Sequence, residues 1–122
     1  MLQNIRLKEQ SFLVYGLGLS GQSVVKFFQK NNFRKFKVWD DKQKKKFNNY
    51  RAKSLKKTLN QVNYIVLSPG VSLLKNKILS KFKNKIITDL DLFFLYNKRF
   101  QSIVITGTNG KSTTCKLLAH IF

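Results

Sequence analysis

Short apolar runs alternate with segments of helical periodicity along this chain. Three runs, at residues 12–15, 36–39 and 62–67, are rich in Phe, Val, Ile and Leu and have the length of buried β-strands. Two further short runs cover residues 85–88 and 103–105. Apolar positions between the runs recur at the three- and four-residue spacing of amphipathic helices. This alternation predicts an α/β fold with a Rossmann-like parallel sheet flanked by helices.

Four segments between the runs have a helical or loop character. Residues 24–28 carry the apolar face of a helix that follows the first strand, and residues 72–82 predict an amphipathic helix with an N-terminal serine. Residues 42–57 are dense in Lys and Asn and predict an exposed loop and a helix. Residues 89–96 begin with two aspartates, which favour the positive end of a helix dipole. A metal site is the alternative interpretation of these two aspartates.

Three turns at strand ends carry candidate binding chemistry. The first strand breaks into Gly16-Leu17-Gly18-Leu19-Ser20-Gly21, where the glycines allow a tight turn, close approach of a diphosphate and packing of a helix on the strand. Asp40-Asp41-Lys42 ends the second strand, and Asp40 follows Gly21 at the spacing of a ribose-binding carboxylate. Ser68-Pro69-Gly70 ends the third. Because parallel strands end at one edge of a sheet, we expect the three turns to line one crevice. A purely structural turn is the alternative for the glycines.

A second glycine loop, Gly107-Thr108-Asn109-Gly110-Lys111-Ser112-Thr113, follows the last apolar run. Lys111 supplies a positive charge for phosphates, and Ser112 or Thr113 supplies a hydroxyl for Mg²⁺. The first loop has neither group and suits a diphosphate that is bound and held. The second suits a nucleoside triphosphate whose terminal phosphoryl group is transferred. Ile105 stands where the common phosphate-loop pattern has its first glycine, so this is a shortened form of that loop.

Composition changes this picture little. The formal net charge of +19 would suit a nucleic-acid partner. The Lys residues, however, are spread along the whole chain, which indicates a general compositional bias, and we expect no specific nucleic-acid partner. No apolar run approaches the roughly 20 residues that span a bilayer, and the amino terminus lacks the apolar core of a signal peptide. The single Cys115 cannot form an internal disulfide. We therefore expect a cytoplasmic protein without a membrane partner.

The motifs, taken in order, resemble the Mur ligases of peptidoglycan synthesis. They are GLGLSG at 16–21, SPGV at 68–71, DLDLFF at 89–94 and ITGTNGKST at 105–113, and the likeness covers nearly the whole chain from about Phe12. The most similar branch is the one that adds D-glutamate to UDP-N-acetylmuramoyl-L-alanine. The sister ligases for L-alanine typically have His in place of Asn109.

The resemblance implies an ATP-dependent ligase that forms an amide bond through an acyl phosphate, with Mg²⁺ as a cofactor, in cell-wall biogenesis and thus in cell shape and division. UDP-N-acetylmuramoyl-L-alanine and D-glutamate would be its substrates, and we expect a monomer. Matching motif positions assign the UDP part to Gly18, Leu19, Ser20, Asp40, Asp41, Lys42 and Gly70. They assign ATP to Gly107, Thr108, Asn109, Gly110, Lys111, Ser112 and Thr113. Lys111 would be the catalytic contact to the phosphates, and Ser112 would bind Mg²⁺.

Three departures from the family pattern bear on these expectations. The family usually has Thr-Arg where this chain has Asp41-Lys42, and Lys cannot reproduce a bidentate Arg contact. Asp91 stands where the family tends to have Glu. The family has three domains, so we expect residues 1–97 to form the UDP-binding domain and 98–122 the truncated start of the ATP-binding domain. We further expect that the chain alone does not ligate.

Two alternatives stay open at this stage. Gly16, Gly18, Gly21 and Asp40 also suit a fragment of an NAD-dependent dehydrogenase. That interpretation leaves the second glycine loop unexplained. The net charge also suits a basic nucleic-acid-binding module, whose binding to duplex DNA would have to remain tight and selective at high salt.

Overall fold

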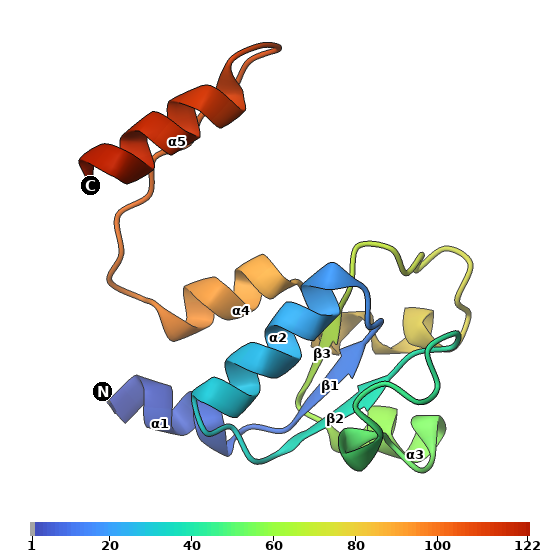
Figure 1. The fold of residues 1–122 in the computed structure, drawn as a ribbon. Coiled ribbons are helices and arrows are strands. Elements are labelled where there is room, and N and C mark those ends of the chain that lie inside the picture. Colours follow the sequence, from blue (N-terminus) through green and yellow to red (C-terminus); the bar gives the residue numbers. More distant parts are fainter. Residues whose placement is uncertain (1) are drawn as a thin grey trace.

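The computed structural model describes residues 2–122, and a parallel β-sheet is at its centre (Figure 1). The sheet has four strands, β1 (Phe12–Tyr15), β2 (Phe36–Trp39), β3 (Tyr64–Leu67) and β4 (Ile86–Ile87). Their order across the sheet is β2-β1-β3-β4, and every pairing is parallel. The expected α/β fold with a parallel sheet flanked by helices is therefore confirmed for this part of the chain.

The central position of β1 in the sheet explains why the sequence of this strand is uniformly apolar. Its four residues are buried, because helices or turns cover both faces of the sheet and strands flank both edges of β1. Phe12 is paired with Phe36 on one side and with Tyr64 on the other. A strand enclosed in this way has no polar face, so it shows a continuous apolar run instead of alternation.

Three helices cover one face of the sheet: α1 (Leu2–Glu9), α2 (Leu19–Lys30) and α4 (Asp89–Tyr96) (Figure 1). Their apolar side chains meet alternate residues of the strands in one core, which includes Leu7, Val24, Val25, Phe28, Leu92, Phe12 and Val14. The α2 prediction from residues 24–28 is confirmed. The sequence analysis did not anticipate α1.

The other face is covered by α3 (Leu55–Gln61) and by a 3₁₀ segment, η2 (Leu79–Lys85). Leu59 and Leu79 are fully buried there against the strands. A shorter 3₁₀ turn, η1 (Asn48–Tyr50), lies beside β2. The segment 42–57 thus contains the expected loop, and the helix begins only near its end.

The α-helix expected at residues 72–82 is not formed, and that prediction was wrong. Residues 73–78 contain turns, and η2 begins at Leu79, where the Asn76 side-chain oxygen accepts a hydrogen bond from the Leu79 amide at 3.1 Å. Side chains such as Asn compete with helix formation by bonding to nearby backbone groups. The apolar spacing was also misleading, because Leu79 is fully buried whereas Leu74 is 97% exposed.

The start of α4 agrees with the sequence prediction. Thr88 and Asp91 form a capping box, in which the Thr88 hydroxyl accepts from the Asp91 amide and the Asp91 carboxylate accepts from the Thr88 amide. These hydrogen bonds from Thr88 lower the pKa of Asp91. Within residues 2–122, no three His, Cys, Asp or Glu side chains gather as a metal site. The capping box supports the helix-start interpretation for Asp91.

The carboxyl-terminal segment differs from the sheet. The strand expected at residues 103–105 is not formed, and Ile103 and Val104 are 62% and 81% exposed. A strand needs a hydrogen-bonded neighbour, and no strand of the described residues pairs with this run. The expected helix after the second glycine loop is present as α5 (Lys111–Ile121), which stands apart from the sheet (Figure 1). None of the described helices is long and apolar enough to span a membrane.

Candidate functional site

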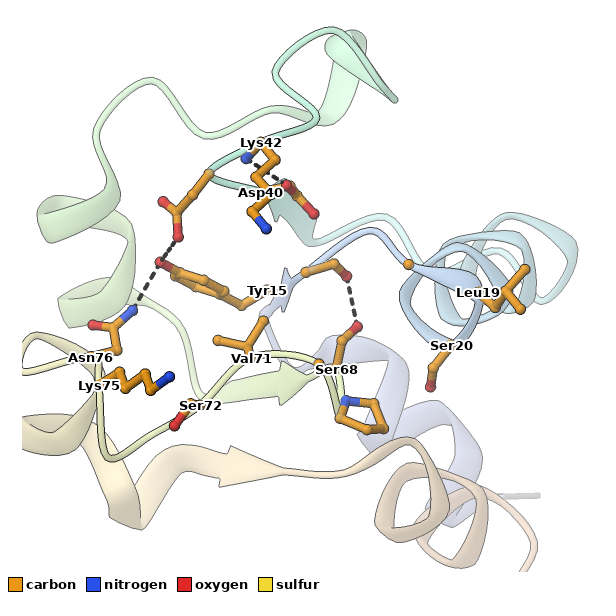
Figure 2. Close-up of a pocket in the computed structure, with 15 residues that line it drawn as sticks. Tyr15, Leu19, Ser20, Asp40, Lys42, Ser68, Val71, Ser72, Lys75 and Asn76 are labelled. Atoms are coloured by element: carbon orange, nitrogen blue, oxygen red, sulfur yellow. Dashed lines mark hydrogen bonds between the residues drawn. The ribbon is translucent and has the colours of Figure 1, made fainter.

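A pocket of about 710 Å³ lies at the carboxyl ends of β1, β2 and β3 (Figure 2). The three turns that the sequence analysis assigned to one crevice all contribute to it. All seven residues assigned to the UDP part line this pocket, although they are spread between residues 18 and 70. The lining residues are Tyr15, Gly16, Gly18, Leu19, Ser20, Asp40, Asp41, Lys42, Ser68, Pro69, Gly70, Val71, Ser72, Lys75 and Asn76.

The first glycine loop brings β1, α2 and the third turn close together. Gly16 has a φ of +94°, and a Cβ atom there would lie 2.8 Å from the Cβ of Ser68. A Cβ atom on Gly21 would lie 1.9 Å from the carbonyl oxygen of Gly16. The Ser68 hydroxyl donates a hydrogen bond of 2.8 Å to that same carbonyl. A larger residue would collide with the side chains of Ser68 and Val71 at Gly16 and with the Gly16 backbone at Gly21, so both glycines serve the packing that shapes the pocket.

The amino terminus of α2 lies at the pocket, which Gly18, Leu19 and Ser20 line. Gly18 is the N-cap and offers no side chain to bond them. Such a helix start has unpaired N–H groups and a partial positive charge, and it attracts phosphate. The Ser20 hydroxyl is engaged elsewhere, because it donates to a carboxylate oxygen of Asp89 at 2.5 Å. Ser20 can therefore offer a ligand its backbone more readily than its side chain.

Asp40 holds the backbone of the surrounding turns. One carboxylate oxygen accepts from the Leu17 amide at 2.7 Å, and the other accepts from the amides of Lys42 and Gln43, both at 2.7 Å. Burial alone would raise the pKa of Asp40, but these three hydrogen bonds stabilise the ionised form and lower the pKa below its ordinary value. The carboxylate that the spacing pointed to as a ribose contact is thus already occupied on both oxygens.

Asp41 accepts side-chain hydrogen bonds instead. The Tyr15 hydroxyl donates to one of its oxygens at 3.0 Å, and the indole nitrogen of Trp39 donates to the other at 3.0 Å. The Asn76 amide donates in turn to the Tyr15 hydroxyl at 3.1 Å (Figure 2). Burial, and then the hydrogen bond to Asp41, raise the pKa of Tyr15 to about 12, so the phenol stays protonated as a donor at neutral pH.

Positive charge surrounds these aspartates. Lys42 and Lys75 line the pocket from opposite walls (Figure 2). Outside the pocket, the guanidinium of Arg51 lies 4.6 Å from the centre of the Trp39 ring and donates to the carbonyl oxygen of Asp40 at 3.1 Å. The pocket therefore combines cations and free amides for an anion with the Asp41 carboxylate for a hydrogen-bond donor.

Tyr15, Lys75 and Asn76 line the pocket but were not predicted from the sequence. Tyr15 belongs to a strand that was identified only as apolar core, although its hydroxyl is the single polar group in that run and stands at the carboxyl end. That position was a usable signal. Lys75 and Asn76 lie in the segment that was wrongly expected to be helical, so nothing placed them at the sheet edge.

The second glycine loop has two glycines in left-handed backbone and lies outside the pocket. Gly107 and Gly110 have φ values of +138° and +78°, and Lys111 begins α5 immediately afterwards. Gly107 through Thr113, the seven residues assigned to ATP, are all exposed. Within the described residues, the loop and the pocket do not share a lining residue.

The family described as "Mur ligase MurD-like, N-terminal domain" matches residues 10–88. Three similar proteins are named UDP-N-acetylmuramoylalanine–D-glutamate ligase. The one from Rickettsia prowazekii is 40% identical over 93% of this chain, the one from the Wolbachia of Brugia malayi is 34% identical over 98%, and the one from Francisella tularensis is 37% identical over 87%. The matched region spans 27%, 27% and 24% of these relatives, about a quarter of their length.

Proposed function

This chain belongs to the MurD-like N-terminal domain family of the Mur ligases, and we propose that its pocket binds the UDP part of UDP-N-acetylmuramoyl-L-alanine. The proposed reaction is the ATP-dependent addition of D-glutamate to that substrate through an acyl phosphate. The relatives are named for this ligation, whereas none of the three described is named as a dehydrogenase or a nucleic-acid-binding protein.

One observation carries the proposal. The seven positions that motif matching assigns to UDP come from three turns far apart in the sequence, and all seven line the pocket of about 710 Å³. A pocket at the carboxyl edge of a parallel sheet is where open α/β folds bind nucleotides. A volume of several hundred Å³ is also typical of a small-molecule site.

The two ends of the pocket offer different groups to a ligand. The amides of Leu19 and Ser20 at the start of α2 suit the diphosphate, and Lys42 adds positive charge to the pocket. The Tyr15 end, with its carboxylate and amide neighbours, suits the nucleoside, which carries hydroxyl and N–H donors as well as carbonyl acceptors. We propose this orientation for the bound UDP group.

For the second loop, we propose the ATP-binding role that the motif implies. The residues fit the group, because two glycines in left-handed backbone, a lysine and the start of α5 form a cradle for phosphates. Lys111 would contact the transferred phosphoryl group, Ser112 would hold Mg²⁺, and the backbone from Gly107 to Thr113 would surround the remaining phosphates. Mg²⁺ would neutralise charge on the phosphates. We further propose residues 1–97 and 98–122 as parts of separate UDP-binding and ATP-binding domains, in a monomeric cytoplasmic protein.

Calorimetric titration of the chain tests the pocket assignment. We expect UDP to bind about tenfold or more tightly than NAD, because the seven positions that motif matching assigns to UDP all line the pocket. Gly18→Asp should remove most UDP binding, since it adds a negative charge at the phosphate end and no atom lies within 4 Å of the new Cβ. Asn60→Asp on exposed α3 is the matched control with the same charge change. A clear preference for NAD, or full binding by Gly18→Asp, would refute the proposal.

A further inference from the structure

Two adjacent aspartates end β2, and their hydrogen bonds give them different roles. A carboxylate has about four acceptor sites. Asp40 uses three of them for the backbone amides of Leu17, Lys42 and Gln43. Asp41 accepts only the Tyr15 hydroxyl and the Trp39 indole among the hydrogen bonds of the described residues. Asp41 therefore keeps accepting capacity at the edge of the pocket, whereas Asp40 has nearly none.

The donors that hold Asp41 form a directed chain. The Leu79 amide donates to the Asn76 side-chain oxygen at 3.1 Å, which fixes the orientation of the Asn76 amide group. The Asn76 nitrogen then donates to the Tyr15 hydroxyl at 3.1 Å, and that hydroxyl donates to Asp41 at 3.0 Å. In this arrangement every donor faces an acceptor, and no two donors or two acceptors face each other. This series of hydrogen bonds links the segment after β3, the central strand β1 and the end of β2.

Tyr15, the middle member of this series of hydrogen bonds, is held rigidly. Tyr15 is 2% exposed and belongs to β1, the strand paired on both edges. Trp39 is held from its other side by the guanidinium of Arg51. An Asp side chain in a strand-end turn would otherwise sample several rotamers, so these contacts set the direction of the Asp41 carboxylate.

A carboxylate repels phosphate. Figure 2 shows Leu19 and Ser20, the proposed phosphate end, on the opposite side of the pocket from Tyr15 and Asn76, and Tyr15 is the residue that donates to Asp41. The group that meets Asp41 must therefore be a hydrogen-bond donor of the nucleoside. We propose that Tyr15 and Asn76 are positioning residues, which hold the Asp41 carboxylate in the direction of the nucleoside of the bound nucleotide. Asp40 serves to shape the turn. This inference rests on the proposed binding of UDP.

Binding of two ligands, UDP and inorganic pyrophosphate, distinguishes positioning of Asp41 for the nucleoside from a general contribution to the fold. Asp41→Asn, Tyr15→Phe and Asn76→Ala should each weaken UDP binding by about tenfold, the worth of one hydrogen bond to a charged group. Pyrophosphate has no nucleoside, so its binding should change by less than about twofold. Tyr64→Phe and Asn60→Ala are matched controls outside the pocket and should bind both ligands like the unaltered chain.

Trp39 gives a second readout that needs no variant. It is the only tryptophan of the chain, so its indole N–H gives one identifiable NMR signal, and that group donates to Asp41. Saturating UDP should shift this signal, and pyrophosphate should leave it in place. A signal that stays in place at saturating UDP would overturn the inference, whatever the affinities of the variants.

The outcomes separate the inference from the function on which it rests. Absence of UDP binding by the unaltered chain would refute the proposed function and the inference with it. Normal UDP binding by Tyr15→Phe would refute the positioning role alone. Equal loss of UDP and pyrophosphate binding in the three variants would also refute it, because the residues would then only support the fold.

Discussion

The two glycine loops of this chain have similar local signals but very different surroundings. Each follows an apolar run, contains glycine in left-handed backbone and leads into a helix. Around the first loop, β1 is buried and Asp40 and Ser68 bond its backbone. Around the second, the preceding run is exposed and forms no strand. A motif can thus set turn and helix by itself, whereas a pocket needs the neighbouring strands.

The strongest test of this comparison replaces one glycine in each loop with alanine. Gly21→Ala should destabilise the chain by about 3 kcal/mol and remove UDP binding, because its Cβ would meet the Gly16 carbonyl oxygen, a backbone atom. Gly110→Ala should leave the unfolding of the sheet and UDP affinity unchanged, because its surroundings are open and its strain stays local to α5. Denaturant unfolding and calorimetry check both. Similar destabilisation by the two variants would contradict the difference between the loops.

Acid should affect the first loop through Asp40. The pKa of Asp40 is lower in the folded chain than in the unfolded chain, so its contribution to stability is complete above the unfolded value of 3.8 and is lost as pH falls through the lower folded value. Asp40→Asn should lower the unfolding free energy at pH 7 by about 2 kcal/mol, since its amide cannot replace an acceptor of three backbone N–H groups.

The acid prediction is checked by unfolding curves between pH 7 and pH 2. The loss of stability below pH 4 should be smaller in Asp40→Asn than in the unaltered chain. Asp91→Asn is the control for UDP affinity. The pKa of Asp91 is also lowered, but its capping box lies outside the pocket. That variant should keep full UDP affinity. An unchanged pH profile in Asp40→Asn would show that other carboxylates cause the acid sensitivity.

The smallest expected effect concerns the lysines of the two loops. Lys42→Ala should weaken UDP binding about threefold at low salt and less at high salt, as expected for one partly screened cation near a diphosphate. Lys111→Ala should not change UDP affinity, because Lys111 does not line the pocket. Titrations at two salt concentrations measure both. A larger loss in Lys111→Ala would mean that the second loop contributes to the first site.

The sequence predicted most of the sheet because its signals are local. All four strands, β1 to β4, lie within predicted runs, and the glycine fingerprint located the pocket turn. The segment 72–82 failed because apolar spacing competed with the side chain of Asn76, whose bond to Leu79 favours a 3₁₀ turn. The expected strand at 103–105 failed because strand formation depends on a partner, which its own residues do not specify.

The site was predicted as a list of turns, and its internal organisation was not. Spacing selected Asp40 as the ligand-binding acid, but spacing cannot tell which backbone amides a carboxylate will accept. The role of Tyr15 depends on two partners from other elements, Asp41 and Asn76. Contacts of this kind arise only after the strands assemble.

The strand order β2-β1-β3-β4 also bears on how the chain folds. The turn from Gly16 to Gly21 closes within six residues, whereas the hydrogen bond between Asn76 and Tyr15 joins positions 61 apart. Contacts between distant positions require loop closure and form slowly. In a refolding experiment, secondary structure would therefore appear before the polar end of the pocket is complete. UDP binding would then report the last stage of folding, which makes the nucleotide a kinetic probe of topology.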